Sequence, residues 1–174
     1  PVLEFHVQLM AGGTVSAHVA TGLAVGDTVS VRGPFGAAYL REEHLGPILL
    51  AAGGTGGAPL AAILRAALAL GLTQRIYLYL GARRAALLYD LDRLRALIAG
   101  HRNVILVTGL SDGEDGTAHR PGHVSDLIAA DFAELGAFHV YAAGPPEHCD
   151  AVHRVCLARG LPPESWFADP FVTA

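Results

Sequence analysis

The sequence predicts an α/β fold, a five-stranded parallel doubly wound sheet preceded by a remnant of an antiparallel β-barrel. From residue 47 onward, short apolar runs alternate with helical patterns, as in a parallel sheet with right-handed crossovers. Residues 1–40 carry two strand patterns and one short helix pattern, which are too few for a separate core. Glycines follow three of the expected strands, where ligands bind such sheets. We therefore expect a barrel remnant over residues 1–40 and a sheet domain over residues 46–174.

The first elements alternate in polarity. Residues 3–9 and 27–33 each alternate apolar and polar side chains, which predicts two half-buried strands. Between them, Thr14 or Ser16 is expected to cap a short helix that reaches about Gly22. The second strand should end at the turn over residues 33–36.

The sheet domain follows from apolar runs and their punctuation. The expected strands are residues 47–52, 75–80, 104–110, 138–143 and 165–168, and the expected helices are residues 59–70, 87–99, 124–130 and 146–159. Residues 111–120 form a polar loop, and we expect its acidic side chains to be solvated rather than to bind calcium. The uncharged stretch 45–64 is broken by glycines, so a strand–turn–helix is favoured over a membrane span.

Composition excludes several classes of function. With 52% hydrophobic and 16% charged residues, the chain can bury a core and is not disordered. The net charge of −4 leaves no basic stripe for nucleic acid. All 12 basic residues are arginine, so the chain lacks the lysine of a phosphate-binding P-loop or of a Schiff base.

Cys149 and Cys156 lie seven residues apart on one expected helix, about 10 Å along its axis, so we expect free thiols in a reducing, cytoplasmic compartment. No signal-peptide pattern is visible at the start. His153 shares their helix face, which leaves a zinc site open, although core packing of both cysteines is favoured. His123 is expected to begin a helix, with an approach to a nucleotide as the alternative.

The glycine-marked strand ends point to a dinucleotide. Residues 53–59 would bring backbone N–H groups close to a pyrophosphate, although the strict Gly-x-Gly-x-x-Gly spacing is absent and a tight strand–helix connection is the alternative. Arg83 and Arg84 follow the second strand, where they could contact the adenosine end and pair with a 2′-phosphate, or could simply be solvated. Residues 143–146 make a sharp turn at the fourth strand, which could equally be only a stiff connection.

Together and in this order, these motifs resemble the ferredoxin-NADP reductase superfamily, and within it the reductase components of bacterial aromatic-ring oxygenases of the phenol hydroxylase and naphthalene dioxygenase type. The resemblance covers nearly the whole chain. Residues 12–16 are similar to the loop that holds the flavin pyrophosphate, and residues 33–36 to the end of the flavin-binding barrel. Residues 53–59 resemble the pyridine-nucleotide loop, and residues 168–171 the terminal segment whose aromatic ring covers the flavin.

The resemblance implies an NAD(P)H-dependent flavin oxidoreductase. NADH would reduce FAD, with NADPH kept open by the two arginines, and electrons would pass to an iron–sulfur centre in a ferredoxin or an oxygenase. Thr55, facing the nicotinamide, and Phe171, over the flavin, are the implied catalytic residues. The implied cofactor-binding residues are Gly13, Thr14, Val15, Ser16, Gly53, Gly54, Thr55, Gly56, Gly81, Arg83, Arg84, Ala143, Gly144, Pro145, Pro146 and Phe171.

Three departures from the family pattern stand beside the resemblance. Ala143 occupies the position of a usual cysteine, and the flavin-gripping Arg-x-Tyr-Ser motif is absent. With two cysteines, a 2Fe-2S cluster is expected only outside this chain. The simplest interpretation is the carboxyl-terminal part of a longer protein. The alternatives are an isolated NAD(P)-binding module without flavin activity, or a cousin such as a dihydroorotate dehydrogenase electron-transfer subunit or a flavohaemoglobin reductase domain.

Overall fold

The computed structural model describes residues 2–113 and 118–172. The chain divides into two compact units, Pro1–Gly36 and Ala37–Ala174.

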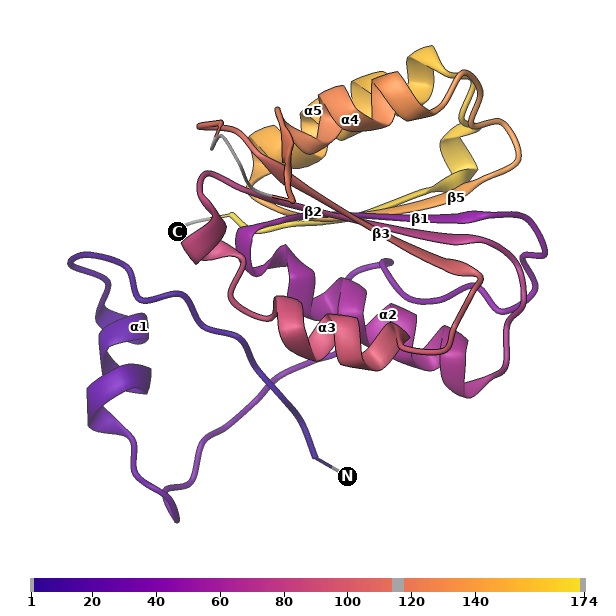
Figure 1. Cartoon of the computed structure of the whole chain (residues 1–174). Helices are drawn as coiled ribbons and strands as arrows, with labels where there is room; N and C mark the ends of the chain where they lie inside the picture. The colour runs from indigo at the N-terminus through magenta and orange to yellow at the C-terminus, as the bar shows by residue number, and fades with distance from the viewer. Residues whose placement is uncertain (1, 114–117, 173–174) are drawn as a thin grey trace. The chain divides into compact units, whose positions relative to one another are not determined.

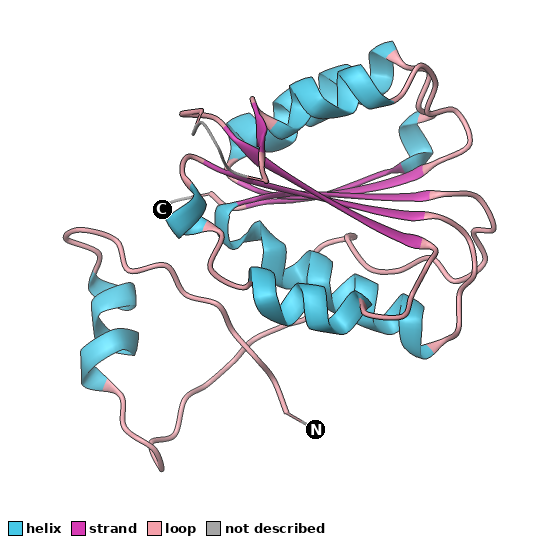
Figure 2. Ribbon diagram, in the orientation of Figure 1, coloured by secondary structure: helices cyan, strands magenta, loops and turns pink. Residues whose placement is uncertain are grey.

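The second unit is built on one parallel sheet (Figure 2). Its strand order is β4-β3-β2-β1-β5-β6, and every neighbouring pair is parallel. The strands are β1 (Ile48–Gly53), β2 (Ile76–Ala82), β3 (Val104–Leu110), β4 (Arg120–Pro121), β5 (His139–Gly144) and β6 (Trp166–Pro170). The chain runs outward from β1 to β4 and then returns to the other side of β1, which places the switch in strand order between β1 and β5.

Helices cover both faces of the sheet (Figure 1). The helices α2 (Gly57–Ala69) and α3 (Leu91–Ile98) lie on one face, and α4 (Val124–Asp131) and α5 (Pro146–Ala158) lie on the other. Short 3-10 turns occupy Gly54–Gly56, Ala85–Leu87 and Pro163–Ser165. No helix within the described ranges combines the length and the apolar character needed to cross a bilayer.

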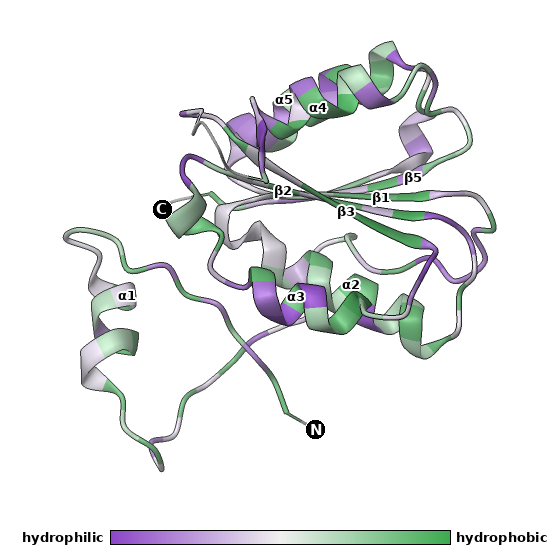
Figure 3. Ribbon diagram, in the orientation of Figure 1, coloured by the Kyte–Doolittle hydropathy of each residue, from purple (hydrophilic) through white to green (hydrophobic). Residues whose placement is uncertain are grey.

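The core forms two apolar layers, one on each side of the sheet. Leu50 packs in the layer with α2 and α3, whereas its neighbour Leu49 packs in the layer with α4 and α5. Every residue of β1 is buried, because side chains on both faces of a central strand meet a helix. In Figure 3, β1 is green at its start and becomes paler toward its glycine end.

The predicted doubly wound parallel sheet is confirmed, with two corrections. The expected five strands become six, because β4 begins at the last residue of the loop predicted over residues 111–120 and pairs with the end of β3. The helix predicted over residues 87–99 begins only at Leu91. A separate 3-10 turn precedes it and leaves Leu87 53% exposed, off the predicted apolar stripe. The remaining elements of this unit lie within two residues of their predicted bounds.

The strands predicted over residues 3–9 and 27–33 are wrong for this structure. Neither segment joins a backbone ladder within the described residues, and without a pairing partner an alternating pattern forms no strand. The short helix is present as α1 (Thr14–Ala17), which continues as a π-helical turn over His18–Gly22. Its N-cap is Gly13 rather than the predicted Thr14 or Ser16.

Candidate functional site

Two strand–helix turns meet at the carboxyl ends of β1 and β5. A methyl group on Gly56, in the β1–α2 turn, would overlap the carbonyl of Ala143 at the end of β5. In return, a methyl group on Gly144 would lie 2.5 Å from the carbonyl oxygen of Gly53, and the φ of 135° at Gly144 also favours glycine. These glycines therefore allow the two backbones to cross in contact.

The open side of this crossing is formed by Gly54. This residue is exposed, has a φ of 55°, and a methyl group placed on it would meet no heavy atom within 4 Å. The following helix, α2, is 13 residues long and directs its N-terminal backbone amides toward this turn. An open, side-chain-free surface at a helix N-terminus fits a pyrophosphate. Thr55, the predicted nicotinamide contact, lies half-buried in the same turn.

His148 supports the crossing from the first turn of α5. Its Nε2 lies 3.1 Å from the carbonyl oxygen of Ala51, and its ring is 2.9 Å from the point where a Gly53 side chain would begin. Burial lowers the pKa of His148, although the hydrogen bond to Ala51 opposes this shift. Sequence reasoning missed this residue, and the available signal was a histidine in the first turn after a glycine-marked strand.

A crevice extends from the β1–α2 turn toward the start of α3. It is lined by Ala52, Gly54, Gly57, Leu80, Gly81, Leu87, Leu88, Tyr89, Asp90, Leu91 and Leu94. Gly81 is a predicted nucleotide contact, and it also has a packing role. A methyl group on Gly81 would lie 2.7 Å from Cγ2 of Val124, so the missing side chain lets α4 approach the sheet.

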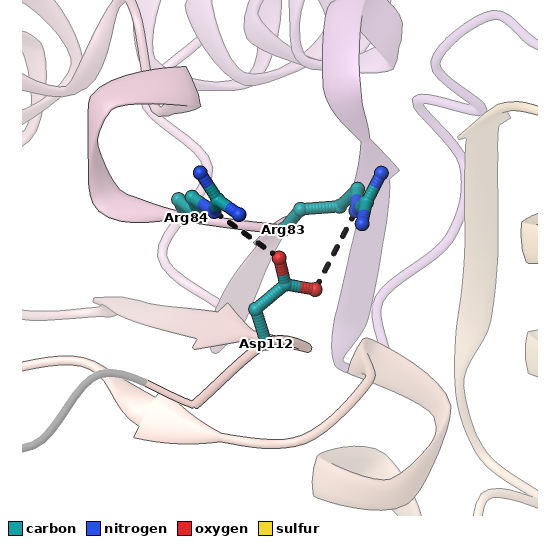
Figure 4. A network of polar contacts seen from close by, with 3 residues as sticks. All are labelled: Arg83, Arg84 and Asp112. Carbon is teal, nitrogen blue, oxygen red and sulfur yellow. Dashed lines mark hydrogen bonds and ion pairs between the residues drawn. The ribbon is translucent and has the colours of Figure 1, made fainter.

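The predicted arginines lie at the carboxyl end of β2. Arg83 and Arg84 are both exposed, and Nε of each lies near one carboxylate, that of Asp112, as Figure 4 shows. Sequence reasoning assigned Asp112 only to a solvated loop. Its position two residues after the third strand was the signal that it would lie beside the residues that follow β2.

The β5–α5 turn brings together the other predicted residues of this unit. Ala143 is fully buried, Pro145 is exposed, and Pro146 begins α5. The backbone N–H of Phe171 donates to the carbonyl oxygen of Gly144 at 2.8 Å. This bond places Phe171, whose side chain is 36% exposed, directly beside the turn.

The predicted flavin contacts lie together in the first unit. Gly13 caps α1, and Thr14 and Val15 are exposed on it. Ser16 is buried, and its hydroxyl accepts a hydrogen bond from the Met10 N–H at 3.1 Å and donates to the Gly13 carbonyl at 3.3 Å. Thr14 and Val15, together with the backbone around Gly13, are therefore the surface that a phosphate could reach.

Both cysteines are buried and free, and burial raises the pKa of the Cys149 thiol to about 11 and that of Cys156 to about 12. His153 stacks on Trp166, with ring centroids 4.5 Å apart. Across residues 2–113 and 118–172, no group of three or more potential ligands could hold a metal ion. Glu114 and Asp115, weighed with Asp112 as calcium ligands, lie outside the described residues.

His123 precedes α4, and its backbone N–H donates to the Asp126 carboxylate.

A parallel sheet with a glycine crossing at its switch point is typical of a dinucleotide-binding domain. Residues 50–154 match the oxidoreductase NAD-binding domain family, and residues 2–39 match the oxidoreductase FAD-binding domain family. The chain belongs to the oxidoreductase NAD-binding domain family.

Similar proteins include reductases of oxygenase systems. The chain is 37% identical over 97% of its length to the ferredoxin–NAD(P)(+) reductase component of a naphthalene 1,2-dioxygenase system from Pseudomonas putida, of which it covers 52%. It is 32% identical over 99% of its length to the reductase component of a phenol 2-monooxygenase from a Pseudomonas species, of which it covers 50%. The chain thus spans about half the length of these curated relatives.

Among solved structures, an Amycolatopsis cytochrome P450 reductase superposes with a TM-score of 0.88 at 34% identity. The match covers 96% of this chain and 51% of that protein. The resemblance inferred from the motifs is thereby confirmed.

Proposed function

We propose that this chain is the NAD(P)H-binding part of a flavin-dependent reductase that supplies electrons to an oxygenase or ferredoxin partner. The observation that carries the proposal is the crossing of the two glycine turns, which leaves an open backbone surface at the switch point of the sheet. The family matches and the reductase relatives support the same assignment.

Within this proposal, each turn has its own task. The open face of Gly54 and the start of α2 bind the pyrophosphate, with Thr55 toward the nicotinamide. Gly53, Gly56 and residues 143–146 shape the floor beneath the nicotinamide. The ring of Phe171 is assigned to cover the flavin until the nicotinamide takes its place, and the backbone bond to Gly144 holds this residue beside the β5–α5 turn.

We assign flavin binding to a first domain, residues 1–40, and nucleotide binding to a second domain, residues 46–174. Bound FAD would supply the chemistry that separates a two-electron donor from one-electron acceptors. Thr14, Val15 and the backbone of Gly13 would meet its phosphates. A 2Fe-2S cluster needs four ligands, so we place it outside this chain, whose two cysteines are buried. The reduced thiols suit a cytoplasmic protein.

The proposal is tested by a matched pair of glycine variants. Gly54→Val should abolish NADH binding, measured by nicotinamide fluorescence, because the valine fills the pyrophosphate surface. Gly71→Val is the control, since Gly71 has a φ of 69° and the same open surroundings at the end of α2. Both variants therefore carry a similar backbone strain. Equal NADH binding by the Gly54 variant and the parent chain would contradict the proposed site.

A second candidate is an NAD(P)-binding module without flavin activity, which is favoured by the lack of a strand ladder in residues 2–36. The two candidates differ in flavin binding. A visible absorption band from bound FAD that survives gel filtration supports the reductase, whereas NADH binding without FAD supports the module. Both results can be read on the same preparation.

A further inference from the structure

Three charged side chains gather where β2 and β3 end. Nε of Arg83 lies 3.4 Å from Oδ1 of Asp112, and Nε of Arg84 lies 3.3 Å from Oδ2 of the same carboxylate. Figure 4 shows both guanidinium groups turned toward Asp112. The arginine side chains are 76% and 69% exposed, and that of Asp112 is 29% exposed. One partly buried carboxylate is thus shared by two exposed cations.

Backbone hydrogen bonds hold Asp112 beside the two arginines. The N–H of Ser111 donates to the carbonyl oxygen of Ala82 at 3.0 Å, and the N–H of Asp112 donates to that of Arg83 at 3.1 Å. These bonds extend the β2–β3 ladder by two residues beyond its strands. Asp112 therefore stands beside the arginines because of the strand register, whichever rotamers the long arginine side chains adopt.

Stability does not explain the cluster, because exposed ion pairs of this kind contribute little to folding. Its position is more informative. Gly81 lines the crevice that extends from the Gly54 turn, and it lies two residues before Arg83. In dinucleotide sites, a carboxylate after the second strand accepts a hydrogen bond from a ribose 2′-hydroxyl, whereas a nearby arginine accommodates a 2′-phosphate. Here the arginines follow β2, and the carboxylate of Asp112 reaches them from the end of the neighbouring β3. This chain places both kinds of side chain together.

We propose that Asp112 is a specificity-determining residue that makes the site favour NADH over NADPH; this inference rests on the proposed function. A 2′-phosphate carries nearly two negative charges at neutral pH, and it would meet the arginines with a carboxylate already between them. The repulsion from Asp112 offsets the attraction of the two guanidinium groups. The neutral 2′-hydroxyl of NADH meets no such opposition and offers a proton to the carboxylate.

The test measures equilibrium binding of NADH and of NADPH to the full chain and to Asp112→Asn. The amide keeps the size of the side chain and removes its charge. We expect the variant to bind NADPH at least about tenfold more tightly than the parent, with the affinity for NADH changed by less than about threefold. The gain should shrink as salt is raised, which a purely structural effect would not do.

Two further variants locate the effect. Arg83→Gln and Arg84→Gln, combined in the Asp112→Asn background, should remove the gain in NADPH affinity. Asp92→Asn is the matched control, because Asp92 is an exposed carboxylate paired with Arg95 on α3, and it should change neither affinity.

An unchanged ratio of NADPH to NADH affinity in Asp112→Asn would overturn the inference. So would weaker NADPH binding, since Asp112 would then be organising the arginines for the phosphate. Both results would leave the proposed function standing. A folded parent chain that bound neither nucleotide would overturn the proposed function and this inference together, so the two failures are distinguishable.

Discussion

Residues 3–33 and residues 48–170 contain similar proportions of apolar side chains, but the two regions differ in how far they bury them. In the sheet unit, Leu49, Leu50 and Leu78 are fully buried between strands and helices. In the first unit, Phe5 is 62% exposed and Val29 is 59% exposed, although both belong to alternating segments. Alternation records which face of a strand could be buried. A strand forms only where another strand completes its backbone hydrogen bonds.

The largest expected effect separates the two regions directly. Leu50→Ala removes a fully buried side chain at the centre of the sheet and should lower the free energy of unfolding by about 3 kcal/mol. Val29→Ala should change it by less than about 0.5 kcal/mol. Urea denaturation followed by circular dichroism measures both. A cost at Val29 close to that at Leu50 would show that the first region also carries a packed core.

The next effect concerns the glycine crossing. Gly56→Ala should cost about 2 kcal/mol, because its methyl group would meet the backbone of Ala143 and Gly144, which cannot rotate away. The adjacent Gly57→Ala is the control. Gly57 begins α2, where alanine favours the helix, and the added methyl group would lie 4.0 Å from Leu80. This substitution should therefore be neutral or stabilising. Equal costs at the two positions would argue against a backbone contact.

The sheet unit should also show a pH effect. Burial is the main cause that lowers the pKa of His139 and of His148 in the folded protein. As the pH falls through about 6.5, the unfolded chain binds protons that these side chains do not, so the free energy of unfolding decreases. We expect a lower urea midpoint at about pH 5.5 than at about pH 7.5.

Substitution assigns this pH effect to a residue. His148→Gln should reduce the difference between the two urea midpoints, whereas His101→Gln, at an exposed position after α3, controls for the loss of one histidine. An unaltered difference in the His148 variant would place the pH dependence elsewhere.

The smallest effect tests a polar contact between β2 and α4. The hydroxyl of Tyr79 donates to the Asp131 carboxylate at 2.6 Å, and Arg120 pairs with the same carboxylate. Burial and this hydrogen bond raise the pKa of Tyr79, and the bond from Arg120 lowers the pKa of Asp131. Tyr79→Phe should cost about 1 kcal/mol. Arg95→Gln, which removes an exposed pair, should cost less than about 0.5 kcal/mol in the same denaturation assay.

The sheet could be predicted because most of its strands are apolar runs, three of them marked by glycines at their ends, and because helical patterns separate them. The strand β4 could not, since two residues carry no periodicity and pair only because the loop returns to β3. Residues 3–9 and 27–33 were assigned from polarity alone, which contains no information about a pairing partner.

The candidate site shows the same limit. Residues 53–59, Arg83 and residues 143–146 carry their own local signals at strand ends. His148 and Asp112 gain their meaning from neighbours 97 and 29 residues away, which only the strand register brings close. Local sequence thus identifies the turns that approach a ligand, and the fold supplies the side chains that adjust them.

The contact of Gly56 with Ala143 and Gly144 also has a consequence for folding order. The turn after the first strand contacts the end of the fifth strand, which lies far along the chain. This contact therefore forms only when a long loop closes. An intermediate holding only β1, β2 and β3 would already possess the α2 half of the ligand surface but lack its floor. Dinucleotide binding would then require the complete sheet. In a pulse-labelled refolding experiment, the time at which the dinucleotide begins to protect backbone amides from exchange would therefore give the time at which β5 joins the sheet.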